Sequence, residues 1–365
     1  MKPLKYLFIS SMLFVATSCG NSWLDLEPST SVDTETSIKI LSDVEFTLNG
    51  IYSTMQSSDA YSGRLVYYGD VTGDDMQAVS STKRVANYYR FNFTKHDNPS
   101  SHWSYLYSII QNCNLILMNI DKLVIDEDDK AYRDDLKGEA LAIRGLALFD
   151  LTRIFGYPYL KDNGASLGVP IIEGLSTIDS KPTRNTVAQC YTKIIDDLTQ
   201  SLSLLGEKFN KGKINKWGAM VLLSRVYLYK GENANALKMA SDAIIGAEKN
   251  KYALWTNEDY PTAWGEDASA SKPGEVLFEI VNLTTDSPGK ESMGYLNSYD
   301  GYDDMCITCS FYQFLKEDPK DIRLKLLSFD KKYYAYVNKY QPQREENIED
   351  ANIPLIRLSE AYLNA

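Results

Sequence analysis

Side chains that carry out enzymatic chemistry are scarce in this chain. Only two histidines occur, His96 and His102, so a metal site with several histidines or a Ser-His-Asp triad is poorly supplied. Asp74-Asp75 and Asp303-Asp304 are acidic pairs, but glycoside hydrolysis needs two carboxylates on opposite sides of the scissile bond. Neighbours in sequence rarely adopt that geometry. We therefore expect no catalytic residues, no metal site and no cofactor.

Four of the five cysteines lie in the body of the chain. Cys113 and Cys190 fall inside amphipathic helical patterns, which predicts buried side chains that behave as small hydrophobic groups. Cys306 and Cys309 have the spacing of a strained local disulfide or of half a metal site. No second C-x-x-C pair completes a zinc tetrahedron, so we expect structural or free thiols.

The remaining cysteine, Cys19, follows a segment with the layout of an export signal. Two lysines supply positive charge, residues 4–15 are largely apolar, and residues 16–18 are small. The apolar run is too short to span a bilayer. This layout predicts cleavage before Cys19 and lipidation of its thiol, as in bacterial lipoproteins, although Ala16 stands where leucine is usual. The alternative is a plain signal peptide followed by an incidental cysteine.

These features divide the chain into three parts. We expect residues 1–18 to be the signal peptide, residues 19–36 a polar tether, and residues 37–365 one domain. No later stretch is apolar enough to predict a membrane span, which leaves the lipid at Cys19 as the predicted attachment. The net charge of −11 argues against a nucleic-acid partner, because phosphates require a basic face.

Helical periodicity dominates this domain. The strongest pattern repeats apolar residues at steps of three and four, and it ends at Gly156: Leu136, Ala140, Ile143, Ala147, Leu151 and Ile154. Arg144 and Asp150 interrupt its apolar character, and we expect neighbouring helices to satisfy them. Further helices are predicted to begin near Ser37, Trp103 and Thr186, and to cover residues 215–229, 233–245, 311–316 and 354–365. Strands are predicted over residues 275–280 and 333–337.

The segments 215–229 and 233–245 predict a helical hairpin. Gly231 lies at its turn, and Ala236, Ala240 and Ala243 present a flat face that allows close approach of the partner helix. Small residues at these spacings resemble the tetratricopeptide repeat. We therefore predict a mostly α fold, a tetratricopeptide-like helix-pair scaffold with long loops and a few short strands.

Two irregular regions, residues 57–101 and 250–310, interrupt the helical pattern. Both are rich in aromatic and small polar residues, and the chain holds 26 tyrosines against 12 phenylalanines. Tyrosine combines a flat apolar face with a hydroxyl, which suits recognition sites. Long ordered connections are usually functional. The alternative for any one of these aromatic residues is that it only packs its loop onto the helices.

Four segments, in this order, resemble the SusD/RagB family of Bacteroidota surface lipoproteins. They are Trp23–Pro28; Tyr68–Asp75 with the following Trp103–Asn114; Gly138–Leu151 with the following Phe155–Pro158; and Pro354–Leu363. The resemblance covers nearly all of the chain after Cys19. In the family a substantial stretch follows the last of these segments, whereas here the chain ends eleven residues after Pro354, so we expect an incomplete C-terminal part.

The resemblance implies a fold and a function. Family members have a scaffold of tetratricopeptide-like helix pairs, are anchored to the outer membrane by lipid, and face the cell exterior. They cap a SusC-like TonB-dependent transporter and deliver glycans to it, or peptides in some cases, without catalysing a reaction. The alternatives for this chain are therefore an oligosaccharide receptor, a peptide receptor of the RagB type, or a transporter lid with no small ligand of its own.

A glycan site needs flat aromatic rings for the C–H faces of sugars and polar side chains for their hydroxyls. The second irregular region is the better candidate, because no helical period buries its aromatic residues. The predicted site residues are Trp255, Tyr260, Trp264, Tyr295, Tyr299 and Tyr302, with Asp74, Tyr88 and Tyr89 from the first region; Tyr67, Tyr68, Asp75 and Arg90 are further candidates. A sugar site should show exposed coplanar rings, a peptide site a charged groove, and a scaffold protein loop aromatics that are wholly buried.

Overall fold

The computed structural model describes residues 37–94, 100–177, 179–265, 273–330, 334–342 and 347–365. The chain divides into two units, Met1–Lys39 and Ile40–Ala365, and every described helix and strand lies in the second. Cys19, the predicted signal peptide and the predicted tether lie outside the described residues. Among the residues described, no helix has the length and apolar character that crossing a membrane requires.

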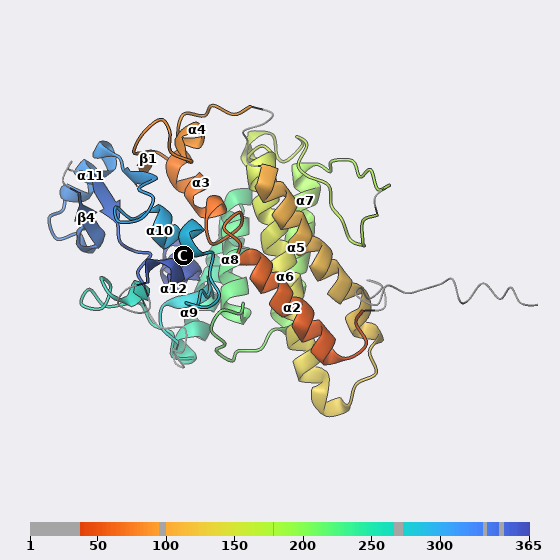
Figure 1. Ribbon diagram of the computed structural model, residues 1–365. Helices are drawn as coiled ribbons and strands as arrows, with labels where there is room; N and C mark the ends of the chain where they lie inside the picture. Colours follow the sequence, from red (N-terminus) through yellow and green to blue (C-terminus); the bar gives the residue numbers. More distant parts are fainter. Residues whose placement is uncertain (1–36, 95–99, 178, 266–272, 331–333, 343–346) are drawn as a thin grey trace, which may run out of the picture. The chain divides into compact units, whose positions relative to one another are not determined.

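The scaffold is a row of helices that pack in chain order (Figure 1). Its members are α2 (Leu41–Met55), α5 (Ser100–Asn119), α6 (Lys130–Phe155), α7 (Val187–Leu204), α8 (Lys216–Lys230) and α9 (Asn233–Lys249). Each contacts the next, and α12 (Leu358–Asn364) packs on α8 and α9. This row of successive packed helices confirms the predicted tetratricopeptide-like fold.

Helix α6 is the centre of the scaffold. Its residues from Gly138 to Thr152 are all buried, because α5 and α7 cover it and α2 and α8 add further contacts. The predicted apolar stripe is therefore only part of a surface that is buried on every side. Glycines allow α7 to approach closely, since a Cβ at Gly145 would lie 3.0 Å from Cγ of Leu198.

Polar residues within α6 are satisfied by other helices, as predicted. The guanidinium of Arg144 donates to both carboxylate oxygens of Asp197 in α7, at 2.8 and 2.7 Å, and to Oδ1 of Asn114 in α5, at 2.8 Å. Asp150 accepts a hydrogen bond of 2.8 Å from the hydroxyl of Tyr61. These buried groups therefore tie neighbouring helices together.

The hairpin of α8 and α9 follows its predicted pattern. Gly231 ends α8 in the left-handed region with φ of 81°, and Ala236, Ala240 and Ala243 are buried. Helix α7 begins with a capping box in which Thr186 and Gln189 exchange side-chain and backbone hydrogen bonds of 3.1 and 2.9 Å.

The first irregular region contains more structure than its sequence predicts. It holds α3 (Arg64–Thr72), β1 (Met76–Ala78) and α4 (Ala86–Tyr89). Helix α3 forms because Tyr67 and Val71, one turn apart, are buried on the same face. The prediction that residues 57–101 are irregular is therefore wrong over α3 and α4.

The strands of the described residues form two-stranded antiparallel sheets. β1 pairs with β3 (Met305–Ile307), β2 (Val276–Ile280) with β6 (Ile353–Arg357), and β4 (Leu327–Phe329) with β5 (Ala335–Val337). Short helices α10 (Met293–Leu296) and α11 (Cys309–Lys316) lie between them along the chain. The strand predicted over 275–280 is confirmed.

The helix predicted over 354–365 is wrong in its first part. Residues Ile353–Arg357 pair with β2 as a strand, and the helix begins only at Leu358. Pro354 disfavours helix for the residue before it, and Ile353 and Ile356 are buried against the rest of the fold.

Candidate functional site

The two irregular regions of the sequence meet in the structure. Strands β1 and β3 pair them, with Met76 opposite Ile307. Beyond the strands, the amide of Val79 donates to the carbonyl of Asp304 at 3.3 Å, and Nζ of Lys83 donates to the carbonyl of Tyr302 at 2.5 Å. Figure 1 shows the orange segments α3, α4 and β1 beside the blue segment that holds α10.

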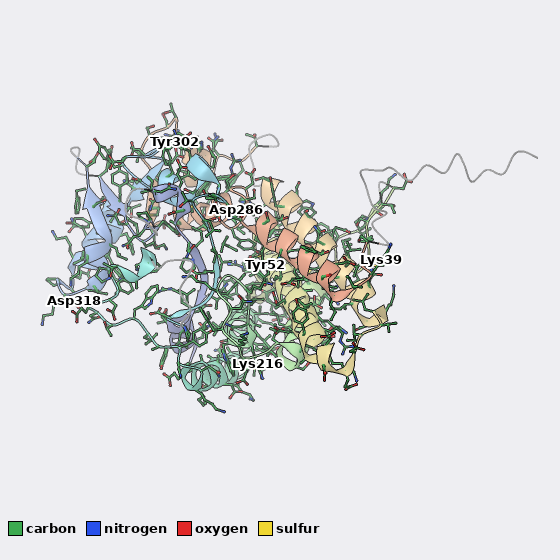
Figure 2. The ribbon with its side chains drawn as sticks, turned by 60° about the horizontal axis from the view of Figure 1, so that its bottom comes forward. Lys39, Tyr52, Lys216, Asp286, Tyr302 and Asp318 are labelled. Atoms are coloured by element: carbon green, nitrogen blue, oxygen red, sulfur yellow. The ribbon has the colours of Figure 1, made fainter. Side chains whose placement is uncertain are left out.

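Three tyrosines of the second region lie at this junction, and we call Tyr295, Tyr299 and Tyr302 the tyrosine platform. Tyr295 and Tyr302 are half-buried and pack with their ring centroids 5.0 Å apart, at an interplanar angle of 78°. Tyr299 is 48% exposed. Figure 2 shows Tyr302 at the opposite edge of the view from the scaffold residue Lys216. The expectation of coplanar rings is wrong for Tyr295 and Tyr302, which meet edge to face.

A tight backbone turn fixes the tyrosine platform. The side chain of Ser292 accepts from the amide of Tyr295 and caps α10, and the amide of Tyr302 donates to the carbonyl of Tyr295 at 3.0 Å. A Cβ at Gly301 would lie 2.0 Å from that same carbonyl oxygen, so the turn requires glycine there.

Charged side chains surround the platform in opposite pairs. Arg84 lies over the ring of Tyr302, with its guanidinium carbon 4.0 Å from the ring centroid. The same guanidinium pairs with Asp304 at 3.1 Å and with Glu291 at 3.2 Å. Lys83 lies 3.6 Å from Asp303. Burial raises the pKa of Asp304, although the neighbouring Arg84 opposes the shift.

These pairings bear on the acidic pair Asp303-Asp304. Asp303 accepts from the hydroxyl of Tyr336 and contacts Lys83, whereas Asp304 binds Arg84. The two carboxylates thus serve different basic partners.

Tyrosines of the first region pack mainly on one another. Tyr88 is only 7% exposed, and its ring contacts those of Tyr67 and Tyr68 at 6.1 and 5.5 Å. Tyr89 is half-buried. Asp74 is exposed in the left-handed region with φ of 66°, and its carbonyl accepts from Oγ1 of Thr308 at 2.8 Å. Roles for Tyr88, Tyr89 and Asp74 in ligand binding stay predictions.

The other aromatic residues of the second region form a separate cluster. The ring of Trp264 contacts those of Trp255 and Tyr260 at 5.0 and 5.6 Å. Tyr260 and Trp264 line a cavity of about 200 Å³. We call it the tryptophan cavity; its polar lining residues include Asp70, Asp75, Asn297, Arg323, Lys339 and Arg357.

Strand β5 separates this cavity from the platform. Tyr336 contacts the ring of Tyr299, whereas Val337, the next residue, lines the tryptophan cavity. Successive side chains of a strand point to opposite faces. The predicted residues of the second region therefore belong to two places, not one.

The chain is similar to proteins of one known family. The family model described as starch-binding and associating with the outer membrane, of the SusD-like group, matches residues 22–228. The chain belongs to the SusD-like family. The curated SusD-like protein P2 of Formosa agariphila is 27% identical over 82% of this chain and 57% of its own length. The chain spans about half the length of the curated relatives that it matches.

Solved structures give the same family. A crystal structure of a putative sugar binding protein from Bacteroides vulgatus is 83% identical and superposes with a TM-score of 0.89, over 90% of this chain and 74% of that one. A SusD superfamily protein from the same organism is 36% identical, with a TM-score of 0.83 and the same coverage.

The sequence did not single out several residues that line the platform or the cavity. Asp70 and Arg357 lie inside segments that carry the family resemblance, so a signal for them existed. Tyr336 lies in the predicted strand over 333–337, but no local pattern links it to the site. Only tertiary contacts bring Arg84, Tyr336 and Lys339 to the platform or the cavity.

The four cysteines of the described residues differ in exposure. Cys113, Cys190 and Cys306 are buried, Cys309 is exposed, and all four are free thiols, as predicted. Burial raises the pKa of Cys113 to about 12. Within the described part of the chain, no group of three or more His, Cys, Asp or Glu side chains is placed to hold a metal ion.

Proposed function

We propose that this SusD-like chain binds an oligosaccharide at the tyrosine platform. The observation that carries the proposal is the junction of the two irregular regions, where the exposed ring of Tyr299 belongs to the same turn as half-buried Tyr295 and Tyr302. A sugar ring would place its C–H face on Tyr299, and its hydroxyls would bind the charged groups around Arg84. The likeness to a putative sugar binding protein at 83% identity supports this assignment.

The charges around the platform favour a neutral ligand. Arg84 is balanced by Asp304 and Glu291, and Lys83 by Asp303. A peptide receptor would be expected to present unbalanced charge in a groove. A lid or scaffold with no ligand of its own is expected to bury its loop aromatics wholly, whereas Tyr299 is exposed. The same balance suits binding without catalysis, since both carboxylates of the acidic pair already have partners.

The test is calorimetric titration of the full chain with a panel of neutral oligosaccharides. Replacing Tyr299 with Ala should weaken binding of the active glycan by roughly tenfold to a hundredfold, because a stacked ring is worth ~1–3 kcal/mol in the related case of nucleobases. Tyr157→Ala is the matched control, since Tyr157 is 57% exposed and lies outside the platform. Equal affinity in Tyr299→Ala and the native chain would refute the platform, and silence across the panel would favour the peptide or lid alternatives.

We also propose that the bound glycan passes to a SusC-like TonB-dependent transporter and that lipid on Cys19 holds the protein at the outer membrane, facing the cell exterior. The family resemblance supports both points. Cys19→Ser should move the protein from the membrane fraction to the soluble fraction and abolish incorporation of labelled fatty acid. Membrane retention of Cys19→Ser would contradict the anchor. Co-purification of the native chain with a transporter in mild detergent tests the partner.

A further inference from the structure

The tryptophan cavity carries opposite charges on walls that are otherwise largely apolar. Asp70 enters it from α3, and Lys339 and Arg357 enter it from the C-terminal part of the chain. Apolar side chains make up much of the remaining lining: Met76, Phe311, Leu315, Leu326, Leu327 and Val337. A volume of about 200 Å³ is far more than one water molecule needs, and it is smaller than the pockets that hold drug-sized ligands. The space therefore suits one small molecule.

Arg357 is held in place in the wall of the tryptophan cavity. Its Nη1 lies 2.9 Å from Oε1 of Glu275, and its guanidinium carbon lies 4.7 Å from the ring centroid of Trp264. A guanidinium has five N–H donors, and among the described residues only the Nη1 group of Arg357 has a hydrogen-bond acceptor. The remaining donors suit a carboxylate, which guanidinium groups bind through charge-assisted hydrogen bonds.

Asp70 and Lys339 both line the cavity but form no ion pair with each other. Within the described residues, neither side chain makes a hydrogen bond or an ion pair. The ammonium of Lys339 instead lies 5.1 Å from the ring centroid of Tyr340 and 5.9 Å from that of Trp264. Burial raises the pKa of Asp70, with Lys339 opposing the shift and Asp75 adding to it. The two charges therefore act on each other across the cavity without neutralising each other by direct contact.

Two neutral polar atoms of the lining residues also have unused capacity. Nε1 of Trp264 and Oδ1 of Asn297 are buried and have no hydrogen-bond partner among the described residues. Buried polar groups cost free energy unless a ligand or water satisfies them. The cavity therefore offers unused donors and acceptors, some of them charged, beside apolar side chains.

We infer that the tryptophan cavity binds a free α-amino acid with an apolar side chain. The ammonium of the amino acid would pair with Asp70, and its carboxylate would pair with Lys339 and Arg357. Its side chain would pack on the apolar part of the wall. A simple cation or a simple anion satisfies only one of the two sets of charges and leaves the other unpaired, which costs free energy in a buried site.

The apolar part of the wall selects an amino acid over a sugar of similar size. A sugar ring carries hydroxyls around its whole rim, so the hydroxyls that face Leu315, Leu326 and Val337 would lose water without gaining a partner. An amino acid confines its polar atoms to one end. A peptide is also disfavoured, because its terminal residue carries only one of the two charges. The inference does not rest on the proposed oligosaccharide site, which lies on the other face of β5.

The first experiment titrates the native full chain with a ligand series, followed by tryptophan fluorescence and calorimetry. The probes are leucine, methionine and phenylalanine, each as the free amino acid, the N-acetyl derivative and the amide, with neutral hexoses for comparison. Acetylation removes the ammonium and amidation removes the carboxylate, so each should weaken binding by at least about tenfold. Absence of binding by all three amino acids at millimolar concentration, equal affinity for a derivative, or tighter binding of a hexose overturns the inference.

Variants then test which wall holds which charge. Asp70→Asn should weaken binding of the free amino acid by at least about tenfold and should not weaken binding of the N-acetyl derivative, which has no ammonium. Lys339→Met should weaken binding of the free amino acid and not of the amide. Asp242→Asn, at an exposed pair on α9, is the matched control, and thermal melting reports whether each variant folds. Equal weakening of both ligands in each cavity variant would overturn the assignment.

Tyr299→Ala separates the cavity from the platform. This variant should bind the amino acid as the native chain does, because Tyr299 does not line the cavity. Loss of amino-acid binding in Tyr299→Ala with no change in Asp70→Asn would place the amino acid on the platform and overturn the cavity assignment. Oligosaccharide binding that fails in Tyr299→Ala and survives Asp70→Asn leaves the proposed function intact, even where no amino acid binds.

Discussion

Among single residues, Glu139 in α6 makes the stability of the fold depend on pH. Its Oε2 accepts a hydrogen bond of 2.6 Å from the hydroxyl of Tyr52 in α2. Burial raises the pKa of Glu139 to about 7, although Lys213 and the bond from Tyr52 oppose the shift. The folded chain therefore keeps a proton that the unfolded chain loses at lower pH. The free energy of unfolding should fall as the pH rises from the ordinary carboxyl range to about 7.

Replacing Glu139 with Gln should remove this dependence, because the amide cannot ionise and its oxygen can still accept from Tyr52. The native chain should lose at most about 3 kcal/mol between about pH 5 and pH 8, and the variant should lose less. Urea unfolding at several pH values measures the slope. Asp242→Asn, at an exposed pair with Lys238, is the control that should leave the slope unchanged. A Glu139→Gln slope equal to that of the native chain would show that other groups cause it.

Asp197 is the second residue with a predictable effect. It is fully buried and receives both Arg144 and Lys193, the latter at 3.3 Å. Asp197→Ala would leave the buried guanidinium of Arg144 without its carboxylate, which should cost ~3–5 kcal/mol of unfolding free energy. Asp242→Ala removes a surface pair and should cost no more than about 0.5 kcal/mol. Chemical denaturation of both variants measures the two losses of unfolding free energy. A loss in Asp197→Ala as small as that in Asp242→Ala would mean that the buried network stabilises little.

At the scale of elements, two helical glycines should respond in opposite directions to the same substitution. A Cβ at Gly50 in α2 meets nothing within 4 Å, so Gly50→Ala should stabilise by ~0.5–1 kcal/mol through lower backbone entropy in the unfolded chain. A Cβ at Gly246 in α9 would lie 2.1 Å from the ring of Trp217, which is buried under α9. Gly246→Ala should therefore destabilise by ~1–3 kcal/mol. Thermal melts of the pair test this, and shifts of the same sign would contradict the helix contact.

The sequence predicts elements whose signal is local and misses those whose cause is distant. A few adjacent residues predict helix α7 and its cap at Thr186. Alanines spaced three or four residues apart predict the hairpin of α8 and α9. Strand β6 exists because Val276 lies opposite Arg357, far away along the chain. In the sequence alone, where the pairing with β2 is not visible, the spacing of apolar residues before Leu358 suited a helix.

At the scale of the whole molecule, the same limit applies to the site. The aromatic residues of 250–310 stand out in the sequence as a set because no helical period covers them, although Trp264 is buried in the structure. Their division between platform and cavity was not, because it depends on Tyr336 and Val337 in β5 facing opposite ways. The contact of Lys83 with Tyr302 joins residues 219 positions apart, and no periodicity carries such information.

Net charge offers a final test of the ligand class. The chain carries −11, so a cationic peptide would be attracted to it over long range, and its affinity would fall steeply with salt. A neutral glycan on a platform of paired charges has no such attraction to lose. Raising the salt from about 0.1 M to about 1 M shortens the screening length from ~10 to ~3 Å. We expect the dissociation constant of the glycan to change by less than about twofold over this range.

Glu291→Gln removes one carboxylate from Arg84 and should leave that insensitivity to salt intact for a neutral ligand. A loss of affinity by more than about tenfold at high salt would instead identify a charged ligand and favour the peptide receptor.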